Sequence, residues 1–255
     1  MKLGRLLGAG GWCNQRTSGR RRFGVPPGGP WDLEYFALTK ALAGSAPEGK
    51  AFELLRGTAD FTFSEAGSIA CVGMDGLVEV DGVQDQIGVR IPVSGSSTLT
   101  VRSNLAYIAF VALDQPKSRV GLVAGAKSEL RYLAVGDQLE QAEFHVDPAS
   151  NRAGVRLNGL PPKQTPEIPS EPSCVGAIQL TPSGQLIVIG PDGPTIGGYP
   201  KVGTVIEADL DFVPRLLPGR TVELVPIKWD EARRVAEERS RQLEKAIELI
   251  RIGQA

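Results

Sequence analysis

The segment NRAGVRLNG, from Asn151 to Gly159, holds two arginines whose spacing suits anion binding. Arg152 and Arg156 are separated by an even number of residues, which places both side chains on one face of a strand. Two guanidinium groups on one face form a clamp for a carboxylate or a phosphate. The alternative is that both arginines pair with nearby acids such as Asp147. The residues alone favour neither interpretation.

A second stretch, PDGPTIGGYPKV, combines a turn signal, a glycine pair and polar side chains, namely Asp192, Gly197, Gly198, Tyr199 and Lys201. The aspartate, with the glycine that follows it, is typical of a tight turn. The glycine pair lets the backbone approach a ligand closely, and its N–H groups are suited to form an anion-binding nest. The tyrosine and the lysine point the same way if this segment is extended. The stretch is therefore either a turn or one wall of a site.

Two further polar residues stand where local structure alone does not need them. Gln179 closes the otherwise apolar strand pattern of SEPSCVGAIQL. A buried glutamine requires hydrogen-bond partners, so this residue is either a structural tie or a ligand contact. Asp32 ends the segment GVPPGGPWD, which predicts a rigid turn with Asp32 as the N-cap of a helix.

The charge and the histidine content limit the kinds of site that are possible. The formal net charge is -1 at pH 7, which gives no electrostatic case for binding nucleic acid or an anionic membrane. His145 is the single histidine, so triads with a histidine base and multi-histidine metal sites are disfavoured. The basic run Arg20, Arg21 and Arg22 is interpreted as a solvated loop. No metal site is expected.

The cysteines and the apolar pattern indicate the compartment. Cys13, Cys71 and Cys174 show neither a disulfide framework nor a metal-binding spacing, which favours free thiols in a reducing environment. No stretch is apolar for long enough to cross a bilayer. The N-terminus, MKLGRLLGAGGW, lacks the sustained apolar segment of a signal peptide. We therefore expect a cytoplasmic protein.

The elements that must position these residues are mainly strands. The many glycines and prolines predict frequent turns. Residues 1–31 read as loop and are followed by a short helix, LEYFALTKALA, that Gly44 ends. From Ala51 to about Val146 the chain is a series of short runs with strand character, including AFELLRG, ADFTFSE, SIACVGM, STLTVRS and LAYIAFVAL. Such closely spaced strands predict a barrel or a sandwich.

The second half repeats this pattern after a proline-rich stretch, GLPPKQTPEIPSEPS, which predicts an extended connection. Strands are expected in VGAIQL, QLIVIG, KVGTVIEADL and TVELVPI. The segment from Trp229 to Ile252 is the one long helical pattern, with its apolar residues on a single stripe. We expect three parts: residues 1–145, residues 146–228 and a C-terminal helix at residues 229–255.

Taken together and in order, these stretches resemble the biotin-dependent carboxyltransferase family, also called the allophanate hydrolase subunit 2-like family. This family includes the C-type subunit of 5-oxoprolinase and KipA-type proteins. The matching stretches are GVPPGGPWD, the FELLRG and FTF strands, NRAGVRLNG, GAIQL and GGYPKVGTVIEADLDFVPRLLPGRTVEL. The last stretch is long and unusual enough to make the match specific. The resemblance implies two cyclophilin-like β-barrel subdomains.

The resemblance also implies a function for the chain. It would act beside a subunit-1-like partner, similar to KipI or to the B-type subunit of 5-oxoprolinase, as a carboxyltransferase or an amide-hydrolysing 5-oxoprolinase. The substrate would be an amide- or urea-like small molecule, with carboxybiotin presented by a partner and ATP bound only on a partner. The N–H groups of Gly197 and Gly198 would donate to the ureido oxygen, and Lys201 or Arg156 would anchor the carboxylate. Asp192 or Tyr199 would handle the proton. Arg152, Gln179 and Asp32 complete the expected substrate contacts.

The chain also departs from the family pattern. Members usually carry a Thr-x-x-Gln-Asp-x-Gly-Arg stretch before the GVP motif, where this chain has Cys13 and Asn14 in place of the Gln-Asp pair. Between Leu113 and His145 the chain is shorter than the family pattern, and the Gly-Ser-Arg-Ser-Thr and Pro-Gly-Pro-Gln segments have no counterparts. These departures favour the alternative of a non-catalytic, KipA-like binding or regulatory subunit.

Overall fold

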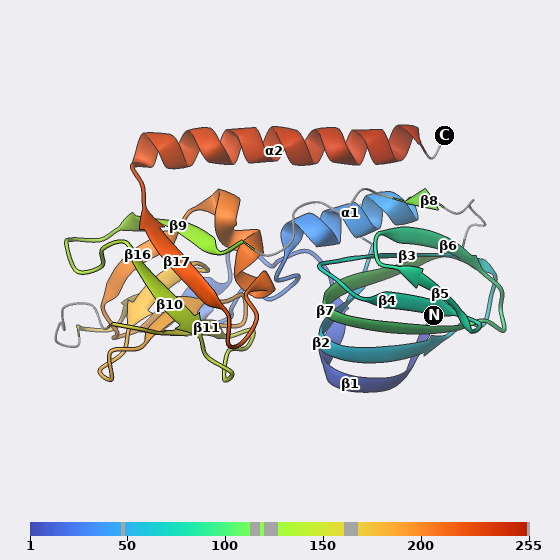
Figure 1. Cartoon of the computed structure of the whole chain (residues 1–255), viewed down its shortest axis with the longest axis horizontal. Helices are drawn as coiled ribbons and strands as arrows, with labels where there is room; N and C mark the ends of the chain where they lie inside the picture. Colours follow the sequence, from blue (N-terminus) through green and yellow to red (C-terminus); the bar gives the residue numbers. More distant parts are fainter. Residues whose placement is uncertain (47–48, 113–117, 120–126, 161–167, 254–255) are drawn as a thin grey trace. The chain divides into compact units, whose positions relative to one another are not determined.

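The chain folds into two compact units in a computed structural model (Figure 1). The model describes residues 1–46, 49–112, 118–119, 127–160 and 168–253. The first unit comprises Met1–Gln15, Leu33–Gly125 and Gln242–Ala255, and the second comprises Arg16–Asp32 and Ala126–Arg241. The division expected at residue 145 falls elsewhere, because the strand Ala142–Val146 lies inside the second unit. The expected shortening between Leu113 and His145, and the proline-rich connection, lie partly outside the described residues.

The first unit is built on an eight-stranded sheet in the order β1-β2-β7-β3-β6-β8, with β4 paired to β7 and β5 paired to β4. Its strands are β1 Lys2–Cys13, β2 Ala51–Thr62, β3 Gly67–Gly73, β4 Leu77–Val80, β5 Val83–Gln86, β6 Val89–Val93, β7 Thr98–Val111 and β8 Ser118–Arg119.

One helix, α1 Leu33–Ala43, lies along this sheet and packs on β3 and β7 (Figure 1). Phe36 contacts the ring of Tyr107 edge to face, with the ring centroids 5.9 Å apart. The helix ends as the sequence predicts: Gly44 takes a left-handed conformation and donates its N–H to the Ala41 carbonyl. The expectation of a short N-terminal helix is confirmed.

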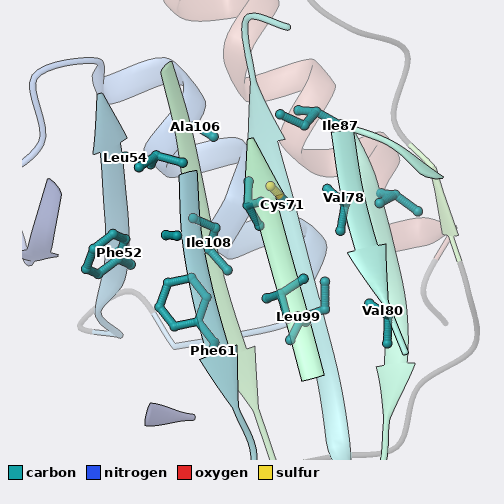
Figure 2. Packing of buried hydrophobic residues seen from close by; sticks show 14 of the residues in the cluster. Phe52, Leu54, Phe61, Cys71, Val78, Val80, Ile87, Leu99, Ala106 and Ile108 are labelled. Atoms are coloured by element: carbon teal, nitrogen blue, oxygen red, sulfur yellow. The ribbon is translucent and has the colours of Figure 1, made fainter. Parts of the chain in front are cut away.

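The core of the first unit is an apolar cluster of side chains from neighbouring strands that point toward one another (Figure 2). Phe52 and Phe61, both on β2, meet edge to face with their ring centroids 5.2 Å apart. Cys71 on β3 is fully buried within the cluster. Burial raises the pKa of its thiol, so Cys71 is a small apolar core residue and not a reactive thiolate.

The prediction that residues 1–31 are loop is wrong for Lys2–Cys13, which forms β1 and pairs antiparallel with β2. Its glycines hid the strand pattern, and they are needed because a Cβ atom on Gly10 would lie 2.6 Å from the Glu53 carbonyl oxygen. The expected break between AFELLRG and ADFTFSE is also absent. Arg56, with a φ of 49°, forms an irregularity inside the continuous strand β2.

The second unit contains a closed barrel with the strand order β10-β11-β14-β13-β16-β9-β17, which confirms the mainly β fold class. Its strands are β9 Glu129–Ala134, β10 Ala142–Val146, β11 Gly154–Asn158, β13 Ala177–Leu180, β14 Leu186–Ile189, β16 Lys201–Val205 and β17 Thr221–Pro226. A separate two-stranded sheet pairs β12 Glu171–Pro172 with β15 Ile196–Gly197. Short 3₁₀ helices, η1 Arg21–Phe23 and η2 Glu207–Arg215, complete the unit.

The barrel interior is filled by alternate residues of each strand. Side chains in a strand point to opposite faces in turn, and the positions of one parity are almost completely buried here. These interior residues are Leu130, Tyr132, Phe144, Val146, Val155, Leu157, Ile178, Leu180, Leu186, Val188, Val202, Val222 and Leu224. The residues between them face outward, and they are the ones available to build a site.

The helix η2 corrects the strand that was expected through KVGTVIEADL, since β16 ends at Val205. The cause is Asp209, whose side chain is completely buried and binds the beginning of β9. It accepts hydrogen bonds from Arg131 N, Nε and Nη2 at 2.9, 3.0 and 2.7 Å, and from Lys127 Nζ at 3.1 Å. Burial alone raises the pKa of Asp209, but the bonds from Arg131 outweigh it and hold the pKa below its usual range.

The long C-terminal helix is confirmed as α2, Trp229–Ile252. Near its beginning Ala232 is buried in a small apolar cluster with Ile206 and Ala208, and Val235 packs against them. Among the described residues, no helix is both long and apolar enough to cross a membrane.

We predict that Asp209→Asn lowers the free energy of unfolding at pH 7 by about 2–3 kcal/mol, because it removes one partner of a mostly buried ion pair. The pKa of Asp209 is depressed in the folded state, so its contribution is present above the unfolded pKa of about 3.9. The contribution is lost as the pH falls through the lower, folded pKa. Urea unfolding of both proteins between pH 7 and pH 2.5 should therefore show the difference shrinking in acid. Glu207→Gln, an exposed position on the same helix, is the matched control. A difference that stays constant with pH would contradict the assignment.

Candidate functional site

The outer wall of the barrel carries a row of side chains from three neighbouring strands. Arg156 on β11 pairs in register with Ile187 on β14, and Ile187 pairs with Gln179 on β13. Residues paired directly across strands lie on the same face, so these side chains share the face opposite the barrel interior. The row therefore presents a cation, an apolar side chain and an amide, in that order.

The two-stranded sheet covers the amide end of this row. Gly197 belongs to β15, and a Cβ atom placed on it would lie 3.5 Å from Gln179 Nε2. Gly198 follows, and its carbonyl accepts the N–H of Ile168 at 3.0 Å. The glycine pair thus lets the backbone of this segment approach the barrel wall closely, as the sequence indicates.

A pocket of about 540 Å³ lies at this wall, which is a volume typical of small-molecule sites. Its lining comes from the outer face of β11, β13 and β14, from the turn before β11 and from the segments around β12 and β15. The lining residues are Asn151, Ala153, Gly154, Arg156, Ile168, Ser170, Gln179, Ile187, Ile189, Pro194, Gly197, Gly198 and Tyr199.

Gln179 is the most unusual residue of the pocket. Its side chain is only 2% exposed, and its Nε2 has no hydrogen-bond partner. Among the described residues nothing bonds to either polar atom of this side-chain amide. An unpaired buried donor costs about 1–3 kcal/mol, so proteins rarely keep one without a use for it. Of the two interpretations of Gln179, the structure therefore favours a ligand contact over a structural tie.

Arg156 is held in place along one edge of its guanidinium group. Its Nη1 donates to Gln185 Oε1 at 3.0 Å, and Gln185 Nε2 donates in turn to Asn158 Oδ1 at 2.7 Å. Asp147 lies near this network, and its pKa is lowered mainly by the backbone N–H of Ala149, with smaller contributions from Asn158 and from the charge of Arg156. The Nε–Nη2 edge of Arg156 has no hydrogen-bond partner among the described residues.

Arg152 does not share the strand face with Arg156, because it lies in the tight turn that links Asn151 to Gly154. Its guanidinium group forms two hydrogen bonds with Asp192, at 2.6 and 3.0 Å, and donates to the Gly29 carbonyl at 2.8 Å. The pair fastens three of the sequence motifs together beside the pocket.

The other expected site residues divide between the lining and its support. Tyr199 lines the pocket and is 38% exposed. Lys201 forms an ion pair with Glu171, the first residue of β12. Asp32 is completely buried and pairs with Arg215, which is also completely buried, at 2.7 Å. The structure thus brings Arg156, Gln179, Gly197, Gly198 and Tyr199 together in one pocket, while Arg152, Asp192, Lys201 and Asp32 lie outside its lining.

Sequence reasoning misses the contribution of Arg21. The sequence suggests a solvated loop, but Arg21 donates to the carbonyls of Ser173 and of Pro194, which lines the pocket. Ser170 and Asn151 also line the pocket. No local pattern marks these residues, since their position depends on contacts between segments far apart in the chain. Among the described residues there is no cluster of His, Cys, Asp and Glu that could hold a metal ion.

Comparison with known proteins identifies the class. Residues 23–113 and 106–226 match the family model "Carboxyltransferase domain, subdomain A and B", so the chain belongs to this family.

The C-type subunit of the Escherichia coli 5-oxoprolinase is 23% identical over 298 residues, which cover 94% of this chain and 96% of that protein. The same-named protein of Haemophilus influenzae is 37% identical over 92 residues, 35% of this chain and 30% of that one. The structure of the Kluyveromyces lactis urea carboxylase is 21% identical and superposes with a TM-score of 0.81, covering 96% of this chain and 29% of that one. The structural likeness shows the shared fold. The chain spans less than a third of the length of the Haemophilus and Kluyveromyces proteins in these matches.

We predict that Asp32→Asn lowers the free energy of unfolding by about 3–5 kcal/mol, because it leaves the buried charge of Arg215 unpaired. Replacing both residues with apolar ones, in the double variant Asp32→Leu and Arg215→Met, should recover part of that loss. Urea unfolding followed by circular dichroism measures both effects. A loss below about 1 kcal/mol for the single variant would show that the pair is not a structural tie.

Proposed function

We propose that this chain is one subunit of a carboxyltransferase or 5-oxoprolinase-type enzyme, acting with a subunit-1-like partner on an amide- or urea-like small molecule. Family membership supports the class of chemistry. The name of the Escherichia coli relative, which designates one lettered subunit of an enzyme, supports a multi-subunit assembly. The observation that carries the proposal is the pocket in which an unpaired amide, Gln179, lies beside an open edge of Arg156.

In this proposal the lining residues bind and orient the substrate. Arg156 anchors a carboxylate through its open edge, because that edge matches two carboxylate oxygens. Gln179 pairs with an amide of the substrate, and the N–H groups of Gly197 and Gly198 are directed at oxygen atoms that gain charge. Tyr199 is the lining residue with a proton that can be exchanged.

The expected residues outside the lining act as positioning residues. Asp192 holds Arg152 and, through it, the Gly29 carbonyl, so the turn that precedes β11 is fixed. Lys201 holds Glu171, and this ion pair fixes β12 against β15, where Gly197 lies. Their loss would loosen the pocket walls without removing a contact to the substrate.

The cofactors belong to the partner in this proposal. The ureido oxygen of biotin is a hydrogen-bond acceptor, and the unpaired Nε2 of Gln179 is a donor that fits it. Carboxybiotin presented by a partner would supply the carboxyl group. ATP would bind on a partner subunit only.

A non-catalytic, KipA-like role is the second candidate. One observation favours it: the described residues that line the pocket include no Asp, Glu, His or Lys to act as a general base. The replacement of the Gln-Asp pair by Cys13 and Asn14 points the same way. In the catalytic proposal the base must therefore come from the partner or from Tyr199.

We predict that co-expression with a subunit-1-like partner gives ATP hydrolysis that depends on 5-oxoproline or on urea. Arg156→Gln should lower kcat/KM about 10- to 100-fold, since a hydrogen-bonded charge contact is lost. Arg220→Gln, at an exposed position of the same unit, is the matched control and should leave the rate unchanged. Steady-state phosphate release measures all three proteins. A stable complex without substrate-dependent hydrolysis would reject the catalytic proposal in favour of the binding role.

A further inference from the structure

We propose that the ligand of this pocket is a small monoanion with two ends, a carboxylate at one end and an amide at the other, joined by a short apolar body. This inference rests on the proposed function and defines its substrate class more narrowly. It separates carboxylate-bearing amides from neutral urea, which the family membership alone leaves equivalent.

The charge of the pocket selects a monoanion. Arg156 is the single charged side chain among the described lining residues. Because Gln185 already holds its Nη1, the open Nε–Nη2 edge can donate two parallel hydrogen bonds. This planar fork fits the two oxygens of one carboxylate. A phosphate dianion would require a second positive charge, and the lining supplies none among the described residues.

The opposite end of the row selects an amide. Gln179 offers a donor and an acceptor side by side, and among the described residues neither is hydrogen-bonded within the protein. A ligand amide presents the complementary acceptor and donor, so it satisfies both groups at once. A simple hydrocarbon at this position would leave the buried Nε2 unpaired, at a cost in affinity.

The register of the barrel fixes how far apart these two ends are. Ile187 lies between Arg156 and Gln179 in the same row. Neighbouring strands are about 4.8 Å apart, so the Cα atoms of the two polar residues are separated by roughly 10 Å. The two side chains converge on a ligand that rests on Ile187. Urea has neither a carboxylate for Arg156 nor an apolar surface for Ile187.

The test is isothermal titration calorimetry with the full chain, alone and in complex with the subunit-1-like partner. The probes are 5-oxoproline, 2-pyrrolidinone, which lacks the carboxylate, cyclopentanecarboxylate, which lacks the amide, and urea and biotin. We expect 5-oxoproline to bind at least tenfold more tightly than each of the others. Equal or tighter binding of urea, biotin or 2-pyrrolidinone would overturn the inference, as would the absence of binding by every probe.

Variants test each end separately. Arg156→Gln should remove the preference for 5-oxoproline over 2-pyrrolidinone. Gly197→Ala adds a methyl group 3.5 Å from Gln179 Nε2, an ordinary contact that the fold tolerates. It should weaken 5-oxoproline and 2-pyrrolidinone about tenfold and leave cyclopentanecarboxylate unchanged. Arg220→Gln is the control for both. Equal weakening of all probes by Gly197→Ala would contradict an amide end at Gln179.

A further variant, Gln179→Leu, distinguishes a ligand contact from a structural tie. It removes an unpaired buried donor, so the unfolding midpoint in urea should stay the same or rise while 5-oxoproline binding falls about tenfold. A lower midpoint would overturn the ligand role. Because binding is measured without turnover, these outcomes are separate from those of the hydrolysis assay. A chain that binds the acid amide but hydrolyses nothing would support this inference and reject the catalytic proposal.

Discussion

Closure of the seven-stranded barrel is the constraint on which the candidate site depends. A closed barrel has one inside and one outside, and the side chains of every strand must alternate between them. Once Val155, Leu157, Ile178 and Leu186 fill the interior, Arg156, Ile187 and Gln179 have no choice but to face outward. A register shift of a single residue on β11 would bury the arginine and expose the core. The apolar packing of the interior therefore positions the polar row outside it.

The outer row is finished by segments that the barrel itself does not supply. The β12–β15 sheet brings Gly197 against Gln179, and the ion pair of Lys201 with Glu171 holds that sheet to the barrel. Residues 16–32 join the second unit rather than the first. There Gly29 accepts a hydrogen bond from Arg152. The proline and glycine content of these segments is explained by such close backbone approaches, which larger side chains would prevent.

The sequence predicts the regular elements where a period is clear and fails where packing overrides propensity. The stripe of α2 and the Gly44 stop of α1 identify both helices. The strand β1 was missed because its glycines carry no alternating pattern, and their reason is the close approach to β2. The strand expected beyond Val205 gives way to η2 because Asp209 must reach Arg131, a partner 78 residues away. For the site, the motifs lead to Arg156, Gln179, Gly197, Gly198 and Tyr199. They do not separate these from the supporting residues Arg152, Asp192 and Lys201, since the ion pairs that occupy the latter form between distant segments.

The pocket combines a cost to folding with an absence of catalytic groups, and the two observations lead to one division of labour. An unpaired Gln179 makes the folded chain less stable than a leucine would, so its retention is explained only if a ligand supplies the missing bonds. The described lining offers donors and a cation for binding but no carboxylate, imidazole or amine to accept a proton. A site of this kind recognises and orients a substrate, while the groups that react with it come from elsewhere. This is the arrangement expected of one subunit of an enzyme whose chemistry is completed by a partner, and it accounts for why a diverged N-terminal motif at Cys13 and Asn14 can coexist with an intact binding wall.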